Sequence, residues 1–339
     1  MMLFTVLAFV YLALMLFPFF LARSALEPSK ARSLVVKDDN VRDPRYFPKA
    51  FVALMEHALT SYDGDGTIRL SKPETLLEPP LPDGDLISAV VYARGDFVPV
   101  GARTFEKEIY CRGNGALPAQ TMLRAIACRG ALAIGEGCEL ARWADGEASL
   151  TVSPGCRLGI SASSGARLSV AKDCTFRRLY APEIRVGEPV LPAIDPPPVP
   201  LGGEIHRDTG DIEDFGIIEG DVVAMDSLTI GEGAEIRGSI KSRKHVHVKR
   251  GARILGNLVS NGNLVLERDV FIGGVVFSQS WAYIGPDCQI GRAGRIKSVV
   301  ARDGVVLAEG ARVFGYVGGE RDGRTVAAEE FISVIGDKY

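Results

Sequence analysis

The sequence predicts an all-β fold: a parallel β-helix, a triangular solenoid of about 18 residues per rung, with an N-terminal transmembrane helix and a short amphipathic helix. Three observations predict it. Apolar residues recur every 18 positions through much of the chain, turn-forming residues recur with the same period, and one long uncharged segment lies near the N-terminus. A fixed period of this kind is typical of stacked repeats that bury a continuous core between neighbours.

The first element is the uncharged segment of residues 3–22, so we expect residues 1–22 to form a transmembrane helix. About 20 apolar residues span roughly 30 Å as a helix, which is the thickness of a bilayer core. No basic residue precedes the segment, which disfavours a cleaved signal peptide. Basic residues follow it, and the positive-inside rule then predicts a single-pass protein of the cell inner membrane, with the bulk of the chain cytoplasmic. The expected anchor residues are Leu3, Phe9, Leu16 and Phe20.

Residues 23–85 are expected to form a tether that contains the amphipathic helix. Apolar residues from Phe51 to Leu59 recur at spacings of three and four, which indicates a helix with one apolar face. That face could cap the first rung of the solenoid or lie on the membrane. Capping is the simpler interpretation, and we prefer it.

The clearest repeat lies in residues 205–317, the second of two predicted β-helical blocks. Within each unit the apolar residues stand two apart, which indicates short strands with alternate side chains facing one interior. Gly233, Gly251 and Asp269 share one column, and both residue types tolerate the left-handed backbone of a corner. The expected core ladder of this block contains Ile236, Ile254, Ile272, Ile290, Ile230, Val248, Leu266 and Ile284.

The same period appears in residues 86–187, the first predicted block. Cys138, Cys156 and Cys174 occupy its column of small interior residues. A metal site would need a histidine or a fourth ligand close by, so a ladder of buried thiols is the simpler interpretation. Between the blocks, the proline-rich residues 188–204 cannot pair as central strands and are expected to form a loop. We expect residues 318–339 to form a C-terminal cap or tail.

Part of the second block resembles the bactofilin family, also called polymer-forming cytoskeletal proteins. The resemblance rests on the echo Gly-Ala-x-Ile-x-Gly-(Asn/Ser)-(Leu/Ile), seen at Gly251–Leu258, and extends over residues 212–317. It implies triangular β-helices that polymerise end to end without nucleotide and act as scaffolds at the membrane. This chain departs from the usual plan of the family because it is longer and carries an additional block.

We therefore expect a non-enzymatic, membrane-associated cytoskeletal scaffold that self-assembles by end-to-end stacking. No catalytic, cofactor-binding or metal-binding residue is expected. The expected partners are the membrane, further copies of the chain in a homo-oligomer or filament, and other membrane or cell-envelope proteins. A net charge of −3 gives no reason to expect a nucleic-acid partner.

Two enzyme classes are alternatives to this expectation. A hexapeptide-repeat acyltransferase with a left-handed β-helix would need a histidine as general base. Among the four histidines only His206, beside the proline-rich loop, is a plausible base. A sugar-cleaving or sugar-binding β-helix would need clustered acids or aromatic residues on one outward face. The cluster of Asp211, Glu213 and Asp214 is better explained as a solvated turn.

Overall fold

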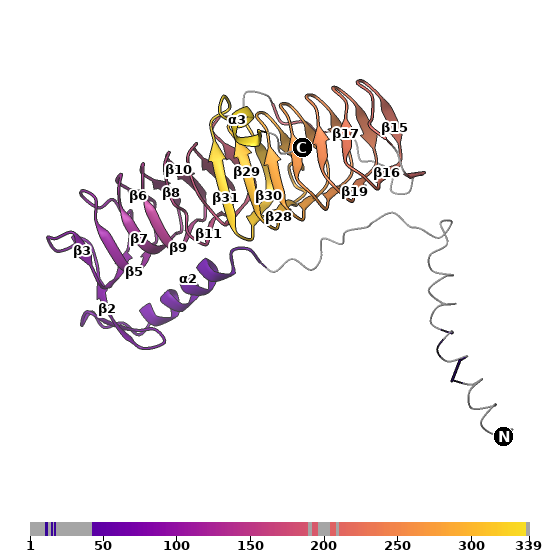
Figure 1. Ribbon diagram of the computed structural model, residues 1–339. Helices are drawn as coiled ribbons and strands as arrows, with labels where there is room; N and C mark the ends of the chain where they lie inside the picture. The colour runs from indigo at the N-terminus through magenta and orange to yellow at the C-terminus, as the bar shows by residue number, and fades with distance from the viewer. Residues whose placement is uncertain are drawn as a thin grey trace, which may run out of the picture.

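The computed structural model describes residues 43–188, 192–195, 204–207 and 210–336, together with Tyr11, Leu12, Met15 and Phe17. The described residues form an all-β solenoid of about 13 turns with two helices. The prediction of a parallel β-helix is therefore confirmed. Two solenoid blocks lie end to end in one long rod (Figure 1).

The prediction that the fold includes a transmembrane helix is wrong. No helix among the described residues is long and apolar enough to cross a membrane. Helix α2 (Tyr46–Leu59) has 14 residues and helix α3 (Phe331–Ile335) has 5, whereas a bilayer core requires about 20 apolar residues. Most of residues 1–22 lies outside the described part of the chain. The predicted anchor residues that lie there are Leu3, Phe9, Leu16 and Phe20.

The first block begins with a hairpin and continues in parallel strands. β1 (Thr67–Arg69) pairs antiparallel with β2 (Pro73–Leu77), and β2 pairs parallel with β4. The rungs therefore begin at residue 73, before the expected boundary at residue 86. The remaining strands of this block are β3 (Leu86–Ile87), β4 (Val90–Ala93), β5 (Thr104–Cys111), β6 (Gly115–Leu117), β7 (Met122–Cys128), β8 (Ala131–Ile134), β9 (Glu139–Gly146), β10 (Ser149–Val152), β11 (Ser161–Ser164), β12 (Arg167–Val170) and β13 (Arg178–Val186).

The second block stacks like residues directly above one another. Ile254 pairs in register with Ile236 on one side and with Ile272 on the other, and Ile272 pairs with Ile290. Its strands are β14 (Ile205–Arg207), β15 (Ile217–Glu219), β16 (Asp221–Ala224), β17 (Leu228–Ile230), β18 (Glu235–Arg237), β19 (Ile240–Ser242), β20 (Val246–Val248), β21 (Arg253–Ile254), β22 (Leu258–Ser260), β23 (Leu264–Leu266), β24 (Phe271–Ile272), β25 (Val276–Ser278), β26 (Trp281–Ile284), β27 (Gln289–Ile290), β28 (Lys297–Ala301), β29 (Gly304–Ala308), β30 (Arg312–Gly319) and β31 (Asp322–Val326).

The two blocks meet through their C-terminal ends. β13, the last strand of the first block, pairs antiparallel with β30 of the second, so that Tyr180 lies opposite Tyr316 and Leu179 opposite Val317. The yellow C-terminal strands accordingly lie in the middle of the rod, and β15 and β16 lie at its far end (Figure 1). Buried residues of both blocks form one continuous core across this joint.

Helix α2 lies along the side of the first block and does not cap its first rung. Met55 and Ala58 of the helix are buried against Tyr92, Tyr110 and Trp143, which belong to β4, β5 and β9. These three aromatic residues face outward from the solenoid, because each lies next to a strand residue of the interior core, namely Val91, Ile109 and Ala144. The preferred interpretation of α2 as an end cap is therefore wrong. Helix α3 covers a comparable outward patch on the second block.

The loop between the blocks is fastened to the second block by Gln289. The Ile194 N–H donates to Gln289 Oε1 at 2.7 Å, and Gln289 Nε2 donates to the Ile194 carbonyl at 2.7 Å. The side-chain amide thus pairs with the loop in the way that a neighbouring strand would. This contact holds the described part of the loop, residues 192–195, against β27.

Candidate binding groove

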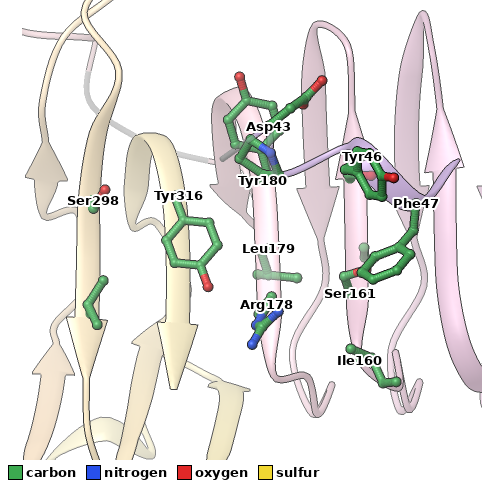
Figure 2. Close-up of a pocket in the computed structure, with 14 residues that line it drawn as sticks. Asp43, Tyr46, Phe47, Ile160, Ser161, Arg178, Leu179, Tyr180, Ser298 and Tyr316 are labelled. Carbon is green, nitrogen blue, oxygen red and sulfur yellow. The ribbon is translucent and has the colours of Figure 1, made fainter. Parts of the chain in front are cut away.

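A groove lies on the outside of the solenoid where the two blocks meet. Its volume is about 840 Å³, which is within the range of roughly 300–1,000 Å³ found for ligand sites. Side chains of β11, β13, β28 and β30 form its floor, and the start of α2 forms one wall (Figure 2). The groove therefore exists only because the two blocks and the helix come together.

The floor of the groove is built by the strand register at the joint. Ser163, Tyr180, Tyr316 and Ser298 are successive partners across four neighbouring strands. Side chains alternate along a strand, and the adjacent Leu179 is fully buried in the core. The row of hydroxyl-bearing side chains therefore points outward, into the groove.

Tyr316 lies low in the groove, over a glycine of its own strand. A Cβ atom at Gly318 would come within 2.6 Å of the Tyr316 hydroxyl oxygen, so a larger residue at this position would displace the ring. Burial raises the pKa of Tyr316 above its ordinary value. The phenol is therefore a neutral hydrogen-bond donor at physiological pH.

The wall of the groove carries two exposed aromatic residues at the start of α2. Tyr46 and Phe47 pack edge to face with their ring centroids 5.6 Å apart. A buried ion pair fixes the chain just before them. Arg45 donates from Nε and Nη2 to the two Asp145 carboxylate oxygens at 2.9 and 2.7 Å, and Ser163 Oγ donates to Asp145 Oδ1 at 2.6 Å. Because both charged side chains are largely buried, this pair positions the wall.

A second polar contact anchors α2 further along the helix. The Glu56 carboxylate accepts hydrogen bonds from Arg112 Nε at 3.1 Å, from Arg112 Nη2 and from the Tyr110 hydroxyl. The Arg112 hydrogen bonds lower the pKa of Glu56 below its ordinary value, although partial burial opposes them. Glu56 is therefore ionised at neutral pH and holds the helix to β5.

The lining of the groove combines aromatic, hydroxyl-bearing and charged side chains. The aromatic rings offer apolar contact, the serine hydroxyls offer hydrogen bonds, and Arg178 and Asp43 supply the charges. No histidine or cysteine is among the lining residues. In the described part of the chain, no group of three or more His, Cys, Asp or Glu residues is placed to hold a metal ion.

The residues of the expected core ladder lie in the interior and do not line the groove. The cysteines are free thiols, and burial raises the pKa of Cys288 to about 12. A hydrogen bond with Cys156 raises the pKa of Cys138, and burial adds to the effect. The ladder residues, all 0% exposed, are Ile236, Ile254, Ile272, Ile290, Ile230, Val248, Leu266, Ile284, Cys138, Cys156 and Cys174.

The histidines lie away from the groove. His206 pairs in register with Val222, so it belongs to an interior column at the far end of the second block, and its Nε2 lies 2.8 Å from the Glu219 carbonyl oxygen. His247 is on the outward side of β20, with Nε2 2.7 Å from Glu267 Oε1. Neither imidazole lines the groove.

Sequence reasoning did not identify the groove. Tyr180 and Tyr316 each alternate with an inward residue, so each could have been assigned to an outward strand face. Nothing in the 18-residue period indicates that these two segments pair, because the period relates residues within one block. The partners in the joint are distant in sequence and antiparallel.

Comparisons of this chain with protein families, with curated proteins and with solved structures found no match. The resemblance to bactofilins therefore stays a prediction.

Proposed function

We propose that this protein is a non-enzymatic scaffold that self-assembles through an end of its solenoid. The observation that carries this proposal is the joint within the chain, where two solenoid ends already pair. Backbone hydrogen bonds cross the joint, for example from Val186 N–H to the Ala311 carbonyl at 2.9 Å and from Phe176 N–H to the Gly323 carbonyl at 2.8 Å. A contact of the same kind between the free outer ends of separate molecules would join rods end to end.

A buried core and ion pairs between rungs hold the rod together. Its interior columns are fully buried, and ion pairs on its surface link successive rungs, as between Arg250 and Glu232 at 2.9 Å and between Arg237 and Glu219 at 2.6 Å. Each exposed pair adds only about 0–1 kcal/mol. The main source of rigidity is therefore the continuous core, and the groove at the joint offers a fixed surface for a client molecule.

One observation favours the acyltransferase alternative. The contact between His247 and Glu267 is of the kind that orients a histidine as general base. Incubation of the purified chain with acetyl-CoA and simple amine or alcohol acceptors tests this alternative. Turnover that is lost in His247→Ala would favour the enzyme, and absence of turnover would favour the scaffold.

The scaffold proposal is tested by sedimentation velocity on the purified full-length chain over a range of concentrations. We expect the mean mass to rise with concentration, and we expect Ile217→Asp, an exposed change at one end of the rod, to reduce the rise. Association through the apolar N-terminal segment would not respond to this substitution. A chain that stays monomeric at every concentration would contradict the proposal.

A further inference from the structure

The two outer ends of the rod differ in how their strand edges are covered. At the β2 end, β1 pairs with the outer edge of β2. The loop that follows carries Pro79, Pro80 and Pro82, which lack the N–H group that an added strand would need. Leu77 and Leu81 from this region pack on the core. β1 and the prolines therefore cover the β2 edge at this end, whereas β3 pairs only with β5 in the described part of the chain.

The opposite end, formed by residues 204–207 and 210–219, has no comparable cover among the described residues. β14 pairs only with β16, and β15 pairs only with β18, so the outer edge of each strand has no partner in the described part of the chain. No proline occurs between Glu204 and Glu219. Both edges are therefore able to accept another strand.

Apolar side chains are exposed at this open end. Ile217 is 63% exposed and Phe215 is 73% exposed. Ile218 continues the interior column of Ile236 but is only partly buried, whereas Ile236 is 0% exposed. The interior of the solenoid is thus incompletely closed here, and a further layer would complete it.

Phe215 also has an unusual backbone conformation. Its φ is +58°, and the equivalent positions in the next rungs, Gly233, Gly251 and Asp269, have φ of +63°, +71° and +58°. Glycine and aspartate tolerate this left-handed region, whereas a bulky side chain does so at an energetic cost. Strain of this type persists where the residue serves a function. An exposed aromatic ring at the open end suits a contact surface.

Two acidic side chains at this end, Asp211 and Asp214, are turned away from a second copy, whereas Glu213 is exposed. Asp211 Oδ1 accepts the Thr229 N–H at 2.7 Å, and Asp214 Oδ1 accepts the Glu232 N–H at 2.8 Å. Both carboxylates are therefore turned back toward the next rung of their own block.

We infer that the open end binds a second copy of the chain about a two-fold axis, with the outer edges of β14 and β15 meeting their counterparts. The inference rests on the proposed self-assembly and names its surface. The joint of β13 with β30 shows that two like ends of solenoid blocks pair antiparallel in this protein. A two-fold contact uses the same surface on both copies and closes on itself. β1 and the prolines cover the β2 edge at the other end of the rod, so we expect assembly to stop at a dimer.

Sedimentation equilibrium of the full-length chain tests the inference with three variants. The wild-type mass should reach a plateau at two copies. Ile217→Asp should weaken the dimer by roughly tenfold or more, as the loss of a central contact does. Phe215→Gly should weaken it too while leaving the Tm unchanged or raised, because glycine relieves the backbone strain. The matched control is Leu86→Asp on β3, which is 57% exposed at the β2 end and should leave the dimer unchanged.

The outcomes separate this inference from the proposed function. Growth beyond two copies, or weakening by Leu86→Asp, would show a head-to-tail contact and overturn the closed dimer. Self-association that persists in both Ile217→Asp and Phe215→Gly would overturn the open end as the surface, while the scaffold proposal would stand. A monomeric wild type would overturn both.

Discussion

Most interior side chains of the second block are stacked between the equivalent residues of the two neighbouring rungs. Ile254 has Ile236 on one side and Ile272 on the other, and all three are 0% exposed. The rungs are held at the spacing of paired strands, so the neighbours cannot move together to fill a gap. The solenoid should therefore be sensitive to the loss of single interior methyl groups.

Ile254→Ala should lower the free energy of unfolding by about 2–5 kcal/mol, the loss found when a large core side chain leaves a cavity. Urea unfolding followed by circular dichroism measures the change. The control is Arg253→Ala, whose exposed side chain lies on the outer face of the same strand and should have little effect. Equal losses in the two variants would contradict the interior assignment of Ile254.

At the scale of elements, α2 is held to the first block by an apolar face and by charged contacts. The pair of Arg45 with Asp145 is the more buried contact, with side chains 12% and 5% exposed. An exposed pair nearby, Lys49 with Asp43, has side chains 55% and 43% exposed. The two pairs have similar chemistry and different burial, so they form a natural comparison.

Asp145→Asn should weaken the docking of α2 by about 3–5 kcal/mol, because it leaves the Arg45 charge buried without its counterion. Hydrogen exchange over residues 46–59 should then be faster. Asp43→Asn, at the exposed pair, should change the free energy of opening that this exchange reports by only about 0–1 kcal/mol. Unchanged protection of α2 in Asp145→Asn would show that the ion pair does not position the helix.

The docking of α2 should also weaken in acid. The pKa of Glu56 is lowered in the folded state, so its contact stabilises the docked helix above the unfolded value of about 4.5 and is lost as the pH falls through the lower folded value. Trp143 reports the change, because Phe51 of α2 packs on it with ring centroids 5.4 Å apart. The emission of Trp143, measured in a Trp281→Phe background, should shift to the red below about pH 4.5.

Glu56→Gln provides the reference for this titration. It removes the carboxylate whose pKa is shifted and keeps a side chain of similar size. The part of the acid response that belongs to Glu56 should be absent in this variant. Identical pH profiles for the two proteins would rule out Glu56 as a source of the transition.

At the scale of the whole molecule, the 18-residue period predicted the stacking within a block but not the joint between blocks. Ile236 and Ile254 reveal their pairing because they are equivalent positions of one repeat. Tyr180 and Tyr316 pair across an antiparallel joint, which no period records. The side-on position of α2 was also missed, although the outward aromatic residues Tyr92 and Tyr110 on neighbouring rungs indicated a covered face.

The direction in which the blocks meet determines where the groove lies and which ends of the blocks face outward. A joint of two C-terminal ends creates the groove, leaves the N-terminal end of each block at an outer end of the rod, and provides the precedent for pairing between molecules. A head-to-tail stack of the blocks would have placed β14 next to β13 and buried the open end. The antiparallel pairing of β13 with β30 therefore determines the architecture of the whole rod.

Disulfide trapping between Tyr180→Cys and Tyr316→Cys tests the joint most directly. Opposed residues of antiparallel strands have Cα atoms about 4.5–5.5 Å apart, within the roughly 4.4–6.8 Å that a disulfide spans. The control pairs Tyr180→Cys with Glu235→Cys on β18, away from the joint. Under mild oxidation, mass spectrometry of the monomeric fraction should show the 180–316 disulfide in high yield and almost no 180–235 disulfide. Equal yields, or no 180–316 disulfide, would contradict the joint.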